Sequence, residues 1–152
     1  GGYIVTAAAG TAMVGVLNGV TFTDATTLKP TFSNFYPAAT TPANSEDVTA
    51  FVNDDPFQEY IIASDATLGG DLATRKSKIG LTYATTAAAG STTTGKSSVQ
   101  LGISTAATTA KQLRVVRVAE DPENSDQTAA NCSLVVKVNL HQYTVGSLAT
   151  GI

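Results

Sequence analysis

Eight consecutive residues near the end of the chain alternate strictly between two kinds of side chain. In residues 134–141 an aliphatic residue stands at every second position, and lysine, asparagine and histidine stand among the positions between. Successive side chains of a β-strand point to opposite faces, so a period of two predicts a strand with one buried face. A helix would require a period of 3.6 residues. The pattern therefore favours a β-fold.

Shorter stretches along the chain also have the pattern or the composition of β-strands. Residues 99–103 also alternate, and residues 48–52, 57–62 and 79–83 are rich in β-branched and aromatic side chains, which suit strands. Residues 113–118 are apolar on both faces, as is typical of a central strand. Glycine-rich and proline-rich turns separate these runs. We therefore predict an all-β fold, a compact antiparallel barrel or sandwich.

The first 45 residues differ from the rest. Alanine-rich and proline-containing stretches predict that residues 1–45 form an extended, loop-rich arm, which packs on a β-domain of residues 46–152. Within the arm, Phe32, Phe35 and Tyr36 place three aromatic residues close together. They either cover one end of the domain or anchor a partner, because aromatic side chains dominate the energetics of many interfaces.

Composition excludes two classes of partner. Charged residues make up 14% of the chain and the net charge is −3, so the clustered cations that bind phosphate backbones are missing. Arg75, Lys76 and Lys78 form the one basic cluster, which we interpret as a solvated loop. No segment is apolar over the length needed to cross a bilayer. We expect neither nucleic acid nor a membrane as a partner.

Residues 90–97 match the phosphate-binding P-loop pattern G-x-x-x-x-G-K-[ST]. That chemistry requires a buried strand before the loop and a helix after it, so that the helix N-terminus faces the phosphates. Here residues 84–89 are rich in alanine and threonine, and residues 98–104 alternate like a strand. We therefore predict a hairpin loop and no nucleotide.

Two acidic clusters lie just before prolines, in residues 53–56 and 120–124. Acidic residues in this position favour tight turns, where their side chains cap backbone amides. The same carboxylates could form a glycosidase pair or a weak Ca²⁺ loop, although the absence of tryptophan disfavours a glycosidase. We interpret both clusters as structural turns.

The chain contains one histidine, His141, and one cysteine, Cys132. A catalytic triad or a metal site would have to be built on His141, and no G-x-S-x-G nucleophile motif is present. His141 falls on the polar side of the alternating run, which predicts a surface or interface histidine. Cys132 lies in an apolar run and is expected to be a small buried residue. We predict no catalytic residue, no cofactor and no metal, and hence a protein that is not an enzyme.

Several stretches in series resemble the capsid decoration (cement) proteins of tailed bacteriophages, which are encoded beside the major capsid protein. They are V-T-A-F-V-N-D-D-P in residues 48–56, G-S-T-T-T-G-K-S in residues 90–97, L-R-V-V in residues 113–116, D-P-E-N in residues 121–124 and L-V-V-K-V-N-L-H-Q-Y in residues 134–143. The resemblance implies a virion protein on the outer capsid surface, whose partner is the major capsid protein and which associates with itself as a trimer or dimer. It implies no catalysis.

The expected partner interface consists of apolar residues outside the strand pattern, together with two residues of the last strand. They are Tyr3, Ile4 and Val5 in the arm, Phe32, Phe35 and Tyr36 in the loop, and His141 and Tyr143 near the last strand. A different class remains as an alternative, namely a carbohydrate- or cell-surface-binding β-sandwich of a fibre or adhesin. The richness in threonine, alanine and glycine suits it equally, whereas sugar sites often stack a ring on tryptophan, which this chain lacks.

Overall fold

The protein is all-β, as predicted. A computed structural model describes residues 4–36, 40–44, 47–91, 93–104 and 110–144. Its strands pair antiparallel in three sheets, and the order of strands in each sheet is linear. The described residues therefore form open sheets and no closed barrel.

The chain divides into two compact units at places other than residue 45. Unit 1 comprises residues 1–14, 56–88 and 99–152, and unit 2 comprises residues 15–55 and 89–98. The expected arm is not a separate segment, because strands on both sides of residue 45 pair with each other. Such pairing depends on contacts between residues far apart in the sequence, which composition does not reveal.

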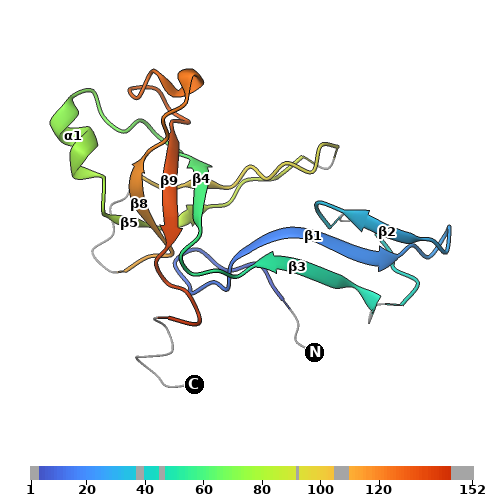
Figure 1. Cartoon of the computed structure of the whole chain (residues 1–152). Helices are drawn as coiled ribbons and strands as arrows, with labels where there is room; N and C mark the ends of the chain where they lie inside the picture. The colour runs from blue at the N-terminus through green and yellow to red at the C-terminus, as the bar shows by residue number, and fades with distance from the viewer. Residues whose placement is uncertain (1–3, 37–39, 45–46, 92, 105–109, 145–152) are drawn as a thin grey trace. The chain divides into compact units, whose positions relative to one another are not determined.

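Unit 2 is built on a three-stranded sheet. Strand β1 (Val16–Thr23) lies between β2 (Pro30–Ser33) and β3 (Thr49–Asn53), as Figure 1 shows. The register of β1 with β3 shifts between Leu17 and Gly19, which marks a bulge. Val20 and Phe22 of β1 are buried on one face of this sheet.

The P-loop-like stretch is a hairpin loop, as predicted, and it belongs to unit 2. The Ser91 amide donates to the Lys96 carbonyl at 3.0 Å, and the Gly95 amide donates to the Ser91 carbonyl at 2.9 Å. Gly95 has a φ of 67°, which favours glycine, and a side chain there would overlap the ring of Phe35. After Lys96 the chain leads to a short strand, β7 (Gln100–Leu101), in place of the helix that phosphate binding would require.

Unit 1 contains the larger sheet, in which β9 lies between β4 and β8 (Figure 1). In spatial order its strands are β4 (Glu59–Ala63), β9 (Ser133–Val138), β8 (Leu113–Val118) and β5 (Thr82–Tyr83). A second, two-stranded sheet pairs β6 (Thr85–Thr86) with β7. The central position of β8 confirms the interpretation of residues 113–118.

The basic cluster lies in a short helix, so the prediction of a loop there was wrong. Helix α1 (Leu72–Ser77) begins after Asp71, whose carboxylate accepts a hydrogen bond from the Thr74 amide at 2.8 Å. Hydrogen bonds from the side chain and the amide of Thr74 lower the pKa of Asp71. Arg75 and Lys76 occupy the last turn, where the helix dipole favours cations. The helix buries no residue, so it carries no apolar periodicity that would reveal it in the sequence.

The second acidic cluster forms a structural turn, as predicted. A 3₁₀ helix, η2 (Pro122–Asn124), begins after Asp121, whose carboxylate accepts from the Glu123 amide at 3.0 Å. The Asn124 side chain then joins the two ends of the connection from β8 to β9. Its amide nitrogen donates to the carbonyls of Ala119 at 2.8 Å and Ser133 at 3.0 Å, and its oxygen accepts from the Ser133 amide at 2.8 Å.

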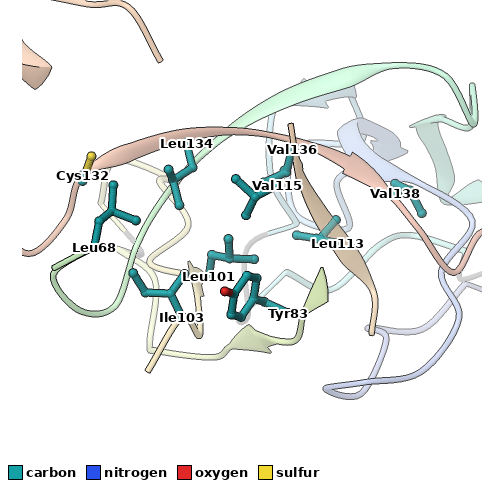
Figure 2. Packing of buried hydrophobic residues seen from close by; sticks show 10 residues of the cluster. All are labelled: Leu68, Tyr83, Leu101, Ile103, Leu113, Val115, Cys132, Leu134, Val136 and Val138. Atoms are coloured by element: carbon teal, nitrogen blue, oxygen red, sulfur yellow. The ribbon is translucent and has the colours of Figure 1, made fainter. Parts of the chain in front are cut away.

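The hydrophobic core lies in unit 1, against one face of the four-stranded sheet (Figure 2). Its buried members are Leu68, Tyr83, Leu101, Ile103, Leu113, Val115, Cys132, Leu134, Val136 and Val138. Leu134, Val136 and Val138 are the inward-pointing residues of the alternating run, which confirms the predicted face. Cys132 is a buried core residue, also as predicted, and desolvation raises the pKa of its thiol.

One core side chain carries a polar group that has no partner. The Tyr83 hydroxyl is buried and makes no hydrogen bond in the described structure, and its oxygen lies on the side of Leu101 and Ile103 (Figure 2). Desolvation raises the pKa of this hydroxyl. A buried hydroxyl without a partner costs about 1–3 kcal/mol in desolvation.

We therefore expect Tyr83→Phe to leave the free energy of unfolding unchanged or to raise it by about 1 kcal/mol. Denaturant titration measures this change, and Tyr143→Phe at an exposed position is the matched control. A loss of more than about 1 kcal/mol would show that the Tyr83 hydroxyl has a bonding partner in solution.

Candidate interaction surfaces

Two phenylalanines lie side by side on the outer face of the sheet in unit 2. The strand register places Phe32 opposite Thr21 and Phe51 opposite Gly19, on the face away from Val20 and Phe22. The two ring centroids are 6.4 Å apart. Phe32 is 65% exposed and Phe51 is 47% exposed. The sheet therefore presents an aromatic pair to its surroundings.

Gly19 makes this arrangement possible. A Cβ atom at Gly19 would lie 2.8 Å from Cζ of Phe32, so the ring lies directly over a position without a side chain. Glycine in a strand interior often marks such a close approach. The pair thus depends on three residues that come from three different strands.

The surroundings of the pair are uncharged. None of the residues of β1, β2 and β3 carries a charge. We define the aromatic face as the side of this sheet formed by Val16, Gly19, Thr21, Thr23, Phe32, Thr49 and Phe51. Exposed apolar side chains among uncharged polar neighbours are typical of protein interaction sites.

Phe35 and Tyr36 make contacts inside unit 2. Phe35 is half-buried and lies against Gly95 of the hairpin loop. The ring of Tyr36 meets that of Phe22 edge-on, with centroids 6.1 Å apart and an interplanar angle of 73°. Both contacts lie within unit 2, and contact of either ring with a partner stays a prediction.

The remaining predicted interface residues belong to unit 1. Ile4 and Val5 are exposed in unit 1, and Tyr3 lies outside the described residues. Tyr143, also in unit 1, is exposed. Phe51, the second ring of the exposed pair, was not among the predicted interface residues, because a strand pattern does not show whether the outer face of the strand is covered. Its apolar character at an outward position was the available signal.

His141 is buried, so the prediction of a surface histidine was wrong. It is 0% exposed, and its Nδ1 accepts from the Tyr143 amide at 3.2 Å. Strand β9 ends at Val138, and His141 instead forms a parallel bridge with Met13. Alternation therefore stops before His141. Its buried Nε2 has no hydrogen-bond partner in the described structure.

The polar residues of the described chain do not gather into a metal site. No group of three or more histidine, cysteine, aspartate or glutamate side chains in these parts of the chain is placed to hold an ion. Asp65 lines a depression of about 230 Å³, and there its carboxylate accepts from the Ile103 amide at 2.9 Å. This bond fixes the end of the β6–β7 hairpin. No helix in the described ranges has the length and apolar character required to cross a membrane.

Comparisons of the chain with protein-family models, with curated proteins and with solved structures found no match.

Proposed function

We propose that the chain is a capsid decoration (cement) protein. It is a structural, non-enzymatic protein that binds the outer surface of a phage capsid, stabilises contacts between major capsid protein subunits, and associates with itself as a dimer or trimer. The observation that carries the proposal is the aromatic face, an exposed Phe32–Phe51 pair on a sheet without charged residues. The resemblance of the chain to decoration proteins supports it.

The physical requirements of such a role match this surface. Burying the exposed parts of the two rings would contribute about 1–2 kcal/mol each. Association costs about 4–15 kcal/mol in lost freedom, so one such contact gives weak binding. Many copies on an ordered shell can still stay bound, because each bridges sites that are already held in place. An uncharged sheet also avoids repulsion between neighbouring copies.

The proposal is tested by removing both rings. We expect the Phe32→Ala, Phe51→Ala double variant to bind capsids that lack the protein about 30-fold more weakly or worse, because about 2–4 kcal/mol of contact energy is lost. Cosedimentation with purified capsids measures the occupancy over a range of protein concentrations.

Phe57→Ala is the matched control, since Phe57 is exposed in unit 1 and lies outside the aromatic face. Circular dichroism and thermal melting establish that each variant is folded. Equal occupancy of the double variant and the unchanged protein would contradict the proposal, and so would an equal loss in the Phe57 control.

The same aromatic face favours one second candidate. Exposed aromatic rings are surfaces on which sugar rings stack, as a carbohydrate- or cell-surface-binding module of a fibre or adhesin would require. A glycan array separates the two functions. Glycan binding that disappears in the double variant, together with no occupancy on capsids, would favour the second candidate.

A further inference from the structure

The net negative charge of the chain comes from one unit. Unit 2 contains five acidic and two basic residues, which account for its net charge of −3, whereas unit 1 contains seven of each. The charged residues of unit 2 are Asp24, Glu46, Asp47, Asp54 and Asp55, with Lys29 and Lys96. Asp47, Asp54 and Asp55 are exposed.

Unit 1 has a basic surface on the outer side of its larger sheet. The register places Lys137 of β9 between Arg114 of β8 and Glu59 of β4, on the side away from the core. Arg117 stands on the same side, opposite Val135. We define the cationic face by Glu59, Ile61, Arg114, Arg117, Val135 and Lys137. It carries three cations and one carboxylate.

The charges on this face are only partly compensated. Glu59 lies 3.5 Å from Lys137 and 3.8 Å from Arg117, and all three side chains are half-exposed, where ion pairs contribute little. Arg114 is exposed and forms no ion pair with the described residues. It also stands directly opposite Lys137, and like charges in that position destabilise a sheet. The cationic face therefore contains a pair of like charges, Arg114 and Lys137, that lowers the stability of the sheet.

An apolar side chain lies among these cations. Ile61 is 72% exposed and stands opposite Val135 on the same side of the sheet. Arginine is enriched at protein interfaces, and burial of an exposed aliphatic side chain beside it would favour contact with a partner. The cationic face thus has the character of a contact surface for an acidic protein.

We infer that the cationic face of one copy binds unit 2 of a second copy. Charge complementarity identifies the partner, because unit 2 holds the whole net negative charge of the chain. The two surfaces differ, so the contact is head-to-tail and can close into a ring. The inference deepens the self-association included in the proposed function by naming the two surfaces, and it involves no capsid residue.

Sedimentation velocity of the full chain tests the inference without capsids. We expect association at about 0.02 M salt and its loss at about 0.5 M salt, because the screening length falls from roughly 20 Å to roughly 4 Å. We expect a weak complex with a dissociation constant of roughly 0.1 mM. A chain that stays monomeric at low salt, at every concentration up to about ten times that value, would overturn the inference.

Charge reversal identifies the surfaces. We expect Arg114→Glu and Asp54→Lys each to weaken self-association about fivefold or more, and a mixture of the two variants to form heterodimers, because each retains one intact surface. Lys76→Glu, the same change at another exposed cation of unit 1, is the control and should associate like the unchanged chain.

Stability provides a separate readout. Arg114→Glu removes the like-charge pair with Lys137, so the melting temperature should stay the same or rise while association weakens. Unchanged association of Arg114→Glu, or a mixture without heterodimers, would overturn the inference. Either result would leave the capsid occupancy of the Phe32 and Phe51 variant as an independent test of the proposed function.

Discussion

Replacing Gly15 by alanine is expected to destabilise unit 2 by about 3 kcal/mol, the upper part of the usual range for overpacking. An alanine Cβ at this position would overlap the carbonyl oxygen of Asn53 and would lie 3.1 Å from Cα of Asp54. Both obstacles are backbone atoms, which cannot move aside as the end of a flexible side chain can. To make room for the Cβ atom, β1 and β3 would have to separate at the pair of Val16 and Asn53, where their pairing begins.

Gly70→Ala is the matched control for this prediction. No atom lies within 4 Å of a Cβ built at Gly70, and its φ is outside the left-handed range. Alanine there should leave stability unchanged or raise it by about 0.4–1 kcal/mol, because it restricts the unfolded chain. Denaturant titration gives the unfolding free energies, and hydrogen exchange reports the amides of β1 and β3. Normal protection of these strands in Gly15→Ala would contradict the prediction, because it would show that the sheet accommodates the added Cβ atom without losing its pairing.

The alternation of apolar and polar residues predicted correctly which side of a strand faces the core. In β9 the alternation correctly identified Leu134 and Val136 as core residues. Val135 is buried as well, although it points to the outer side of the sheet, where Arg117 and Ile61 stand opposite it. A period of two identifies the two faces of a strand, but it does not show which neighbours cover the outer face.

Two of the failures have a common physical cause. His141 was placed by extending the alternation of β9 beyond Val138, whereas the chain turns there and pairs with Met13. The Phe32–Phe51 pair likewise depends on strands whose partners lie far along the chain. Contacts between residues far apart in the sequence determine both the burial of His141 and the pairing of the two rings. The local pattern of a single sequence does not show such contacts. Helix α1 was missed for the opposite reason, since its Asp71 cap acts locally but the helix buries nothing.

The buried side chain of Gln112 connects three distant parts of unit 1. Its oxygen accepts from the Gly10 amide at 3.0 Å, from the Thr85 amide at 3.2 Å and from the Thr85 hydroxyl at 3.1 Å. Its nitrogen donates to the Ala8 carbonyl at 3.0 Å. The backbone carbonyl of Gln112 also accepts from the Asn139 amide at 2.7 Å. One residue thus holds residues 8–10 and the start of β6 against the segment that leads into β8.

We expect Gln112→Leu to lower the free energy of unfolding by about 2–3 kcal/mol. Leucine fills a similar volume but offers no hydrogen bond, so the amides of Gly10 and Thr85 lose their acceptor. A buried donor left without a partner costs about 1–3 kcal/mol, and partial access of water to residues 8–10 keeps the total below the sum of both losses. The backbone bond to Asn139 is unaffected, so β9 should keep its register with β8.

Hydrogen exchange distinguishes this mechanism from a general loss of packing. The amides of Gly10 and Thr85 should lose protection in Gln112→Leu well before those of Val136, which lies in the core. Gln142→Leu makes the same substitution at an exposed position of unit 1 and should change stability by no more than about 0.5 kcal/mol. Uniform loss of protection across β8 and β9 would mean that Gln112 supports the core itself. The hydrogen bonds that Gln112 makes to residues 8–10 would then be incidental to stability.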